Sequence, residues 1–581
     1  MAIWAHTKEA VIRAKFTTLI QDAFGWTIFA PSADSRLIYV DSTLGNDGTA
    51  ATYLLSTLPA GTWRQPVGIA PYATLEAATG QMRSGFPDYL LLKRGESFTL
   101  TTAQWQPEGG RSATERSFVT GYGLGPRPHF DSPASNGLHF RIWSDVNYIG
   151  IVGLHFYPTF RDPGHANFAG FGNTSGAAGI RLYAGSTPMS GVLIEDNLIE
   201  YAQGGIGLTS GISGEKAYID TIIRRNVIRY CWNETAHAQG ISGSWASVIV
   251  EENFFEHNGW YKQAIDPLDP LYPGGGSEEG QATVFNHNFY VSQLIDAIIH
   301  NNVSYNPSSI HFKFTSNPEV TNSVLAHDVI LDDNLMIRGE VGMSLGGNDD
   351  FDDGPRFGDM QVCRNVMTRI GETQNTNRTL AWCGEIQDWA NGFYGQNLIF
   401  KTGNDAVSNT QGTRIQGHCS NVAVSRNIQY DLGPITFEGG GGLYVYAQSG
   451  TMSNVLWAKN IIQNINTQGK AVGAHDVVAG VTHSDNKYYT NAPANEWFEY
   501  DGAGYDKAGW DALTGDTGST VTTVTFVDAT KTLETYMTSL GQASTLDEFL
   551  VKCRAQGDGV WDQNYTARYI NAYFRAGYKE A

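Results

Sequence analysis

One short pattern recurs along most of the chain: an apolar residue, two mostly polar residues, an asparagine and then usually another apolar residue. The eleven asparagines of this pattern are Asn197, Asn226, Asn253, Asn288, Asn302, Asn334, Asn365, Asn397, Asn427, Asn460 and Asn486. Their spacing stays near 30 residues except for intervals of 35 and 14 on either side of Asn288. A fixed period of roughly 20–50 residues indicates a repeat architecture. Because the repeats are rich in strand-forming residues, each should form one coil of a β-solenoid.

Stacking explains why asparagine would recur at one position of each coil. Asparagine tolerates a left-handed bend between strands, and its amide can hydrogen-bond to the coils above and below. We therefore expect the side chains of Asn365 and Asn397 to stack. Parallel crossovers are right-handed, so the sequence predicts an all-β, right-handed parallel β-helix of about eleven or more coils. The alternative is that these asparagines are only turn residues of another all-β domain.

The ends of the chain differ from the repeats. Apolar residues at helical spacing predict a helix over residues 7–24, within an N-terminal cap or attachment segment at 1–36. Entry strands should occupy 37–130 and the β-helix 131–500. After residue 500 the pattern stops, and helices are expected at 532–540, 545–555 and 565–576. This C-terminal segment, 501–581, should cap the open edge of the solenoid.

Composition excludes several classes of function. The net charge of −20 argues against nucleic-acid binding, which needs a basic face. The chain has no run of eighteen or more apolar residues, so no membrane-spanning segment is predicted. The N-terminus lacks the apolar run of a signal peptide. The five cysteines are an odd number without a C-x-x-C pair, which predicts neither a disulfide framework nor a zinc site. The 14 Trp, 28 Tyr and 27 Phe residues suit either a core or stacking platforms for sugar rings.

Three segments before the repeats carry a resemblance. They are Y-V-D…G-N-D-G at 39–48, L-L-L-K-R-G at 90–95 and G-Y-G-L-G-P-R-P at 121–128. Together with the asparagine repeats, they resemble right-handed parallel β-helix proteins of the pectate-lyase-like superfamily. The resemblance implies the fold over about residues 37–500. It leaves activity open, because that superfamily includes lyases, hydrolases, epimerases and inactive binders.

A β-helix without an export signal but with an additional N-terminal helix resembles bacteriophage tailspike polysaccharide depolymerases. That resemblance implies a homotrimer in a virion tail, with the N-terminal segment contacting other tail or baseplate proteins. The implied substrate is a bacterial capsule, exopolysaccharide or O-antigen. A secreted bacterial enzyme is the alternative.

The region 252–388, where the period breaks, is the expected place for a site. Its long coil contains an insertion at 266–279 that should form a wall of a binding groove. Beside it lie His257, His287, Tyr290, His311 and Lys313. Being two residues apart, His311 and Lys313 should share one face of a strand. A base of this kind can abstract the C5 proton of a uronate, which is β-elimination. Ordinary structural histidines are the alternative.

A second cluster in the same region is acidic. Asp349 and Asp350 lie in the acidic loop 348–354, and Glu385 and Asp388 follow about one coil later. Two carboxylates across a groove suit glycoside hydrolysis. The loop could also hold Ca²⁺, although it lacks the spacing of an EF-hand; otherwise no cofactor is expected. A solvated acidic turn is the alternative.

The sequence thus predicts a polysaccharide-degrading enzyme and favours hydrolysis, because an acidic chain would repel a polyuronate. The predicted catalytic residues are His257, His287, Tyr290, His311, Lys313, Asp349, Asp350 and Glu385. The predicted substrate-binding residues are Trp260, Tyr261, Arg338, Trp382 and Asp388. A polysaccharide lyase and a non-catalytic glycan-binding spike remain the alternatives.

Overall fold

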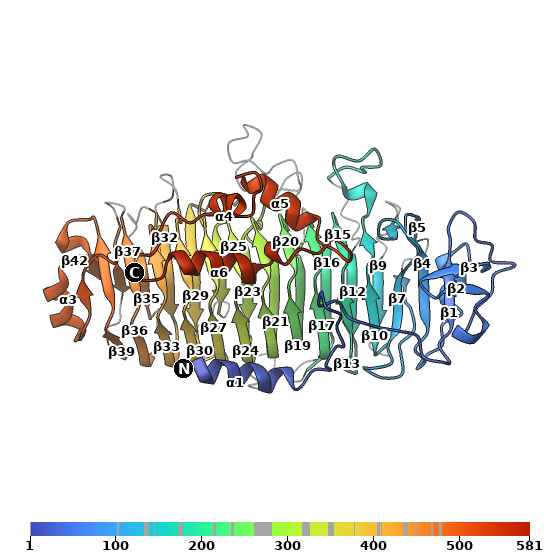
Figure 1. Ribbon diagram of the computed structural model, residues 1–581. Helices are drawn as coiled ribbons and strands as arrows, with labels where there is room; N and C mark the ends of the chain where they lie inside the picture. Colours follow the sequence, from blue (N-terminus) through green and yellow to red (C-terminus); the bar gives the residue numbers. More distant parts are fainter. Residues whose placement is uncertain are drawn as a thin grey trace. The chain divides into compact units, whose positions relative to one another are not determined.

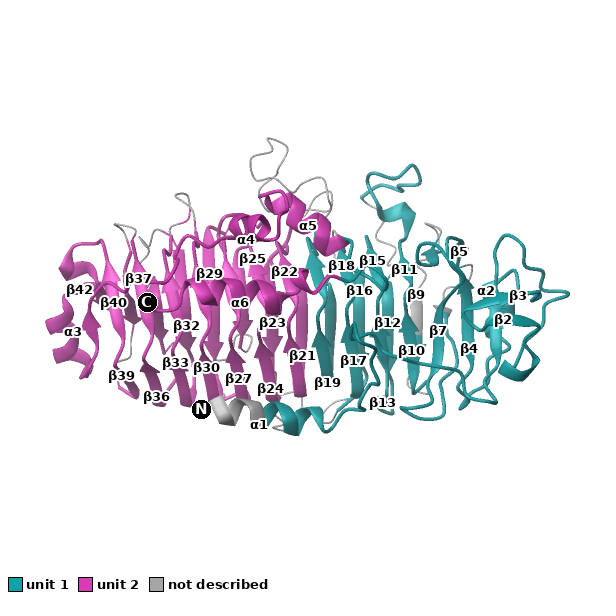
Figure 2. Cartoon of the chain, viewed as in Figure 1, with its two compact units in different colours: residues 1–263, 277–281, 555–561 teal, residues 264–276, 282–554, 562–581 magenta. Residues whose placement is uncertain are grey.

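The computed structural model contains two compact units. It describes residues 2–100, 104–132, 139–143, 146–171, 178–212, 216–233, 237–260, 282–316, 326–346, 354–376, 378–403, 407, 409–433, 440–447, 450–465, 469–475 and 479–581. Unit 1 comprises Met1–Gln263, Ser277–Gln281 and Ala555–Trp561, and unit 2 comprises Ala264–Gly276, Ala282–Arg554 and Asp562–Ala581 (Figure 2).

Each coil is built from three strands, which we call the A, B and C strands in chain order. In one coil of unit 2 these are β27 (Phe357–Cys363), β28 (Val366–Thr368) and β29 (Leu380–Gln387). Each pairs in parallel with its counterpart in the next coil: β30 (Trp389–Gly395), β31 (Leu398–Phe400) and β32 (Asn409–Gln416). The predicted right-handed parallel β-helix is confirmed, and within each unit the strands stand side by side (Figure 1).

Unit 1 repeats this order. Its A strands are β1 (Leu37–Val40), β4 (Tyr89–Lys93), β7 (Ser117–Tyr122), β10 (Ile149–Val152), β14 (Leu193–Glu195), β17 (Tyr218–Arg224) and the second half of β19 (Ile241–Glu251). Its B strands are β5 (Ser97–Thr99), β8 (His129–Asp131), β11 (His155–Phe156), β15 (Leu198–Glu200), β18 (Val227–Arg229) and β20 (Phe254–Glu256). Its C strands are β6 (Gln104–Trp105), β9 (His139–Trp143), β12 (Ala178–Ala184), β16 (Gly204–Ser210) and the first half of β19. A hairpin of β2 (Ala60–Thr62) and β3 (Gln65–Val67), the helix α2 (Leu75–Thr79) and the short strand β13 (Met189–Ser190) complete it.

Unit 2 contains further strands in the same order. Its further A strands are the second half of β21 (His287–His300), β24 (Ala326–Asp332), β33 (Cys419–Ser425), β36 (Met452–Ala458) and β39 (Val481–Ser484). Its further B strands are β22 (Val303–Tyr305), β25 (Leu335–Ile337), β34 (Ile428–Tyr430), β37 (Ile461–Asn464), β40 (Lys487–Thr490) and β43 (Thr520–Val521). Its further C strands are the first half of β21, β23 (Ile310–Thr315), β26 (Val341–Leu345), β35 (Gly441–Tyr446), β38 (Val472–His475) and β41 (Phe498–Tyr500).

The asparagines form a buried hydrogen-bonded ladder between the A and B strands. The Asn365 amide group donates to Oδ1 of Asn397 at 3.1 Å, and the Asn365 backbone N–H donates to the same oxygen at 2.9 Å. The predicted stacking of these two side chains is confirmed. The same contacts join Asn197, Asn226 and Asn253 in unit 1, and Asn302, Asn334, Asn365, Asn397, Asn427, Asn460 and Asn486 in unit 2.

Two details of the ladder differ from expectation. Asn288 lies in the C-strand half of β21, where it donates to Ser304, so the 14-residue interval joins two different positions of the coil. The left-handed residue at the bend is the one before the asparagine, such as Arg364 at φ 57°, and not the asparagine itself. The asparagine side chain therefore faces the interior, where its amide pairs with the next coil.

The N-terminal helix is shorter than predicted. Helix α1 spans Ala2–Arg13 instead of 7–24. The backbone N–H and hydroxyl of Thr17 both donate to the carboxylate of Asp220 in β17, at 2.7 and 2.6 Å. These bonds hold the chain in a non-helical course, and Ile20, an apolar residue within the predicted helix, is 72% exposed.

After residue 500 the chain forms four helices: α3 (Lys507–Thr514), α4 (Leu533–Ser539), α5 (Leu546–Arg554) and α6 (Ala567–Gly577). The last three lie within two residues of their predicted bounds. In unit 2, α3 covers strand β41 by stacking Trp510 on Phe498, with ring centroids 5.2 Å apart. Helix α6 lies over B strands instead, where Phe574 contacts the ring of Phe400 and Asn571 donates to Asp333. All five cysteines are buried, and none of them forms a disulfide bond. Among the described residues, no helix is long and apolar enough to cross a membrane.

Candidate functional site

The outward side of the C strands in unit 2 carries a continuous row of polar and aromatic residues. Parallel pairing fixes the register, so residues at matching positions of successive coils lie side by side. We call this set the C-face row: Tyr290, Lys313, Ser344, Glu385, Arg414 and Tyr444, from β21, β23, β26, β29, β32 and β35. Neighbouring strands are about 4.8 Å apart, so each residue can contact its neighbours in the row.

Hydrogen bonds join the centre of this row. Lys313 donates to Oγ of Ser344 at 3.4 Å, and Ser344 in turn donates to Oε2 of Glu385 at 2.6 Å. The other oxygen of Glu385 accepts from Nε2 of Gln416 at 2.7 Å, and the same amide donates to Gln387 at 2.7 Å. The carboxylate of Glu385 is thus fixed by one donor on each oxygen while its side chain remains partly exposed.

Aromatic rings and a guanidinium group flank the carboxylate. The guanidinium of Arg414 lies 4.9 Å from the ring centre of Trp382 and 5.5 and 5.9 Å from those of Tyr444 and Tyr446. The Nε atom of Arg414 is buried without a hydrogen-bond partner, and Arg414 forms no ion pair within the described part of the chain. Cation–π contacts of this kind hold a guanidinium in place while leaving its charge available to an anionic group.

Such a surface suits an extended, hydroxyl-rich polymer. Aromatic rings stack on the apolar faces of sugars. Carboxylate, amide and hydroxyl groups on neighbouring coils can bind sugar hydroxyls. A carboxylate fixed among them can transfer a proton to or from a substrate.

The structure brings together four of the residues predicted from sequence. Tyr290, Lys313 and Glu385 belong to the C-face row, and Trp382 packs beside it on Ile310 and Val341. The Trp382 indole donates to Asn409 at 3.0 Å, which fixes the orientation of the ring.

His311 does not share a face with Lys313, contrary to expectation. Its side chain is fully buried, with Nδ1 2.7 Å from Oγ of Ser304 and Nε2 2.7 Å from the carbonyl oxygen of Arg338. Burial lowers its pKa to about 3. Both ring nitrogens are engaged within the coil, so His311 does not fit the predicted role of a catalytic base. Side chains at the start of β23 do not alternate between a buried and an exposed face, since its first three residues are all buried.

His287 and Arg338 also have structural partners. His287 is 3% exposed, and its Nδ1 accepts from the backbone N–H of Ile310 at 3.3 Å. Arg338 lies between β25 and β26, where it donates to the hydroxyl of Tyr305 and to Glu372. These contacts do not fit the predicted roles of His287 in catalysis and of Arg338 in substrate binding.

Asp388 occupies the turn between β29 and β30 with a left-handed backbone at φ 57°. Its Oδ1 accepts from the backbone N–H of His418 at 2.8 Å, and burial raises the pKa of its carboxyl group. This contact gives Asp388 a role in the turn and not at the predicted sugar-binding surface.

Two predicted residues lie in unit 1 and are buried. His257, 2% exposed, stacks on Tyr230 with ring centroids 5.7 Å apart. Trp260 packs against His257 and is 0% exposed, so it offers no ring face to a sugar. Their burial does not fit the roles predicted for them.

Tyr261, Asp349 and Asp350 lie outside the described residues, as do the insertion 266–279 and the loop 348–353. The wall and the Ca²⁺ site predicted there therefore stay predictions. Among the described residues, no three His, Cys, Asp or Glu side chains gather as metal ligands.

Sequence reasoning missed Ser344, Arg414, Gln416, Tyr444 and Tyr446. A signal for some of them was present. Counting one repeat of about 30 residues forward from Glu385 leads to Arg414, and a second leads to Tyr444. Ser344 is harder to find, because the segment between β28 and β29 lengthens the coil that separates it from Glu385.

No protein-family model and no curated protein matches the sequence. Similar solved structures include the tailspike protein of E. coli bacteriophage HK620 in complex with a pentasaccharide, at 10% identity and a TM-score of 0.46, covering 89% of this chain and 86% of that one. A GH136 lacto-N-biosidase from Eubacterium ramulus is 12% identical, with a TM-score of 0.38 and coverage of 83% and 67%. The A-module of a mannuronan C-5 epimerase from Azotobacter vinelandii is also 12% identical, with a TM-score of 0.40 and coverage of 78% and 95%.

At these low identities we draw function from the C-face row and not from these proteins. The fold itself follows from the strand pairing, the ladder and the three-strand coil. The chain is a right-handed parallel β-helix protein.

Proposed function

We propose that this protein binds and cleaves a polysaccharide along the C-face row of unit 2. The observation that carries the proposal is the fixed carboxylate of Glu385, held by Ser344 and Gln416 beside the aromatic rings around Arg414. A sugar chain laid across successive C strands would place its rings against Trp382, Tyr444 and Tyr446. Its glycosidic bonds would then pass over Glu385.

The reaction that we favour is glycoside hydrolysis. Glu385 acts as the general acid, donating a proton to the glycosidic oxygen as the bond to the anomeric carbon breaks. A second carboxylate completes the reaction, either by activating water or by forming a glycosyl intermediate. Asp349 and Asp350, in the loop that follows β26, remain the predicted source of that carboxylate.

One observation favours a second reaction, β-elimination. Arg414 carries a charge without a carboxylate partner among the described residues, and it neighbours Glu385 in the row. A guanidinium in that position could neutralise the carboxylate of a uronate. Lys313 or Tyr290 would then take the C5 proton as the C4–O bond breaks.

Digestion of bacterial capsular, exopolysaccharide and O-antigen preparations with the full chain tests both reactions. Hydrolysis produces new reducing ends without a gain in ultraviolet absorbance. Elimination produces an unsaturated uronate, whose conjugated double bond absorbs in the ultraviolet. If the protein binds the polysaccharide without shortening it, the protein is a glycan-binding spike and the proposal of an enzyme is wrong.

We further propose a tailspike-like assembly: a homotrimer acting outside the cell on a bacterial surface, with α1 and the segment after it contacting other tail proteins. Closed symmetry is the norm for homo-oligomers, and the apolar side chains of Val11, Ile20, Phe24 and Ile28 in this segment are more than half exposed. Light scattering should give three times the 63.4 kDa chain mass. A single 63.4 kDa species at micromolar concentration would contradict the trimer.

A further inference from the structure

A separate cavity lies in unit 1, on the outward side of the A strands. Parallel register places Thr120, Val152, Glu195 and Arg224 in one row across β7, β10, β14 and β17. Residues 17–29, which we call the strap, run over this row. The cavity beneath the strap has a volume of about 370 Å³, within the range of small-molecule sites.

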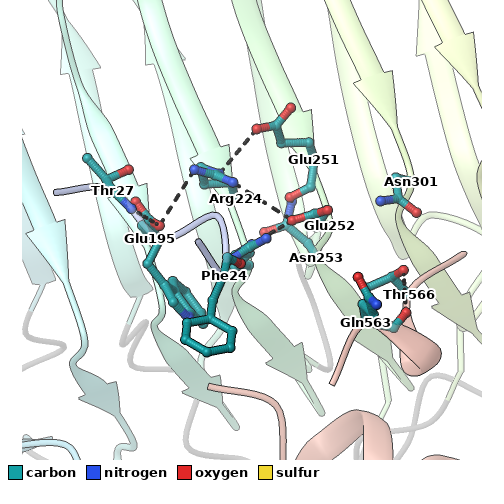
Figure 3. Close-up of polar contacts among 12 residues, drawn as sticks. Phe24, Thr27, Glu195, Arg224, Glu251, Glu252, Asn253, Asn301, Gln563 and Thr566 are labelled. Carbon is teal, nitrogen blue, oxygen red and sulfur yellow. Dashed lines mark hydrogen bonds and ion pairs between the residues drawn. The ribbon is translucent and has the colours of Figure 1, made fainter. Parts of the chain in front are cut away.

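Charged side chains in the A strands and directly after them hold the strap in place. The Thr27 backbone N–H donates to Oε1 of Glu195 at 3.1 Å, and Arg225 donates to the carbonyl oxygen of Phe24 at 2.8 Å. Figure 3 shows Arg224 between Glu195, Glu251 and Glu252, with Thr27 of the strap on the far side of Glu195. The roof of the cavity is therefore fixed to the same carboxylate that lines its wall.

Glu195, which lines this cavity, has a buried carboxylate oxygen without a hydrogen-bond partner. Its side chain is 1% exposed, and Oε2 is buried without a hydrogen-bond partner. Burial raises the pKa of its carboxyl group against the opposing effect of Arg224. A buried polar atom without a partner costs about 1–3 kcal/mol. A hydroxyl group bound in the cavity would remove that cost.

A second carboxylate and a guanidinium converge on the same space. Oδ1 of Asp196 is engaged by Arg127 and by the backbone N–H of Asp558. A Cβ atom on Gly153 would lie 3.3 Å from the other oxygen, Oδ2, and 3.8 Å from Nη1 of Arg94. Arg94 donates from Nε to Gly125, and its remaining nitrogens have no hydrogen-bond partner among the described residues. The missing side chain of Gly153 thus leaves room in front of one acceptor and one donor.

Aromatic rings supply the rest of the lining. Trp26 and Phe29 come from the strap, and Trp63 comes from the β2–β3 hairpin. The guanidinium of Arg64 lies 4.9 Å from the ring centre of Phe29 and 4.7 Å from that of Trp63. A cavity with rings on one side and converging donors and acceptors on the other matches a molecule with an apolar face and a rim of hydroxyl groups.

We propose that this cavity is a second binding site, which takes one or two residues of a neutral sugar under the strap. Sugar hydroxyls both donate and accept, so one can pair with Oε2 of Glu195 while another bridges Asp196 and Arg94. Four carboxylates, from Asp22, Glu195, Asp196 and Asp558, line the cavity against the two guanidinium groups of Arg64 and Arg94. This balance disfavours an anionic sugar. The site is independent of the C-face row and of any cleavage there.

Saturation-transfer NMR and calorimetry with the full chain test the proposal, using glucose, galactose, N-acetylglucosamine and glucuronate as probes. At least one neutral sugar should bind saturably with millimolar affinity, and more tightly than glucuronate. Val152→Phe places a ring in the cavity and should weaken binding at least about tenfold. Ile219→Phe adds the same ring to an exposed position of β17 outside the lining and should leave affinity unchanged.

Glu195→Ala removes the unsatisfied oxygen and should also weaken binding at least about tenfold. Melting temperatures show whether each variant is folded, and Val152→Phe decides the matter if Glu195→Ala does not fold. Glu385→Gln, which tests the C-face row, should bind these sugars as the parent does. Unchanged affinity in Val152→Phe, preference for glucuronate, or no binding of any neutral probe would each overturn the proposal.

Discussion

Ser344 donates a hydrogen bond of 2.6 Å to Oε2 of Glu385, one coil further along the C-face row. The bond joins two residues that are 41 positions apart in sequence. It fixes one oxygen of the carboxylate, and Gln416 fixes the other from the following coil. The position of this acid therefore depends on the stacking of three coils.

Glu385→Gln should lower turnover of the polysaccharide substrate at least about a hundredfold, because the amide cannot transfer the proton. The melting temperature should stay within a few degrees, since the amide can still accept from Ser344. Glu496→Gln, at an exposed position of unit 2, is the matched control and should keep full activity. Ser344→Ala should lower turnover about tenfold, because it removes one hydrogen bond to a charged group. Full activity in Glu385→Gln would remove the assignment of the acid.

Asn365→Ala should destabilise unit 2 by about 2–4 kcal/mol. The substitution leaves the backbone N–H of Asn334 and the carbonyl of Leu331 without their side-chain partners inside the solenoid. Urea unfolding measures the effect. The control is Asn454→Ala, because Asn454 bonds to Asn421 in an exposed pair and its loss should cost under about 0.5 kcal/mol. Equal costs in the two variants would show that the ladder contributes no special stability.

Acidification should destabilise unit 2 partly through His483. Burial lowers the pKa of this histidine to about 4, below the ordinary value of about 6.5. The unfolded chain therefore binds a proton that the folded chain does not. This contribution to stability is present above pH 6.5 and is lost as the pH falls from about 6.5 to 4, by about 1.4 kcal/mol per pH unit. His483→Phe keeps a ring against Trp510 but removes the titration. Its melting temperature should fall less between pH 7 and pH 5 than that of the parent, and an equal fall would contradict this reasoning.

Asp220→Ala should release the strap. Asp220 accepts two hydrogen bonds from Thr17, and it lies 3.7 Å from the guanidinium of Arg116. Limited proteolysis with trypsin should cut after Lys15 several-fold faster than in the parent. Thr17→Val removes only the hydroxyl bond and should give a smaller increase. If both variants resist trypsin as the parent does, other contacts hold the strap.

The sequence determined the architecture, because every coil of the solenoid repeats the same local pattern of residues. An asparagine every 30 residues or so specifies a buried amide that must pair with the coils above and below, and this requirement predicts both the stacking and the contact of Asn365 with Asn397. The C-terminal helices were predictable for a similar reason, since caps such as Thr532 and apolar periodicity act within a few residues. The N-terminal helix was placed wrongly, because a long-range bond between Thr17 and Asp220 overrides the local pattern.

The tertiary structure alone decided which chemical groups meet. Register between coils brings Lys313, Ser344 and Glu385 into one row, and their spacing in sequence varies because turns and loops differ in length from coil to coil. His311 looked equivalent to Lys313 at a distance of two residues, yet it faces the interior because the start of β23 does not alternate. The cavity in unit 1 has no sequence signature, because it exists only where residues 17–29 cross strands that are distant in sequence, such as β14, whose Glu195 lies 168 residues from Thr27. Contacts within a repeat are encoded locally, whereas contacts between coils depend on the length of every turn between them.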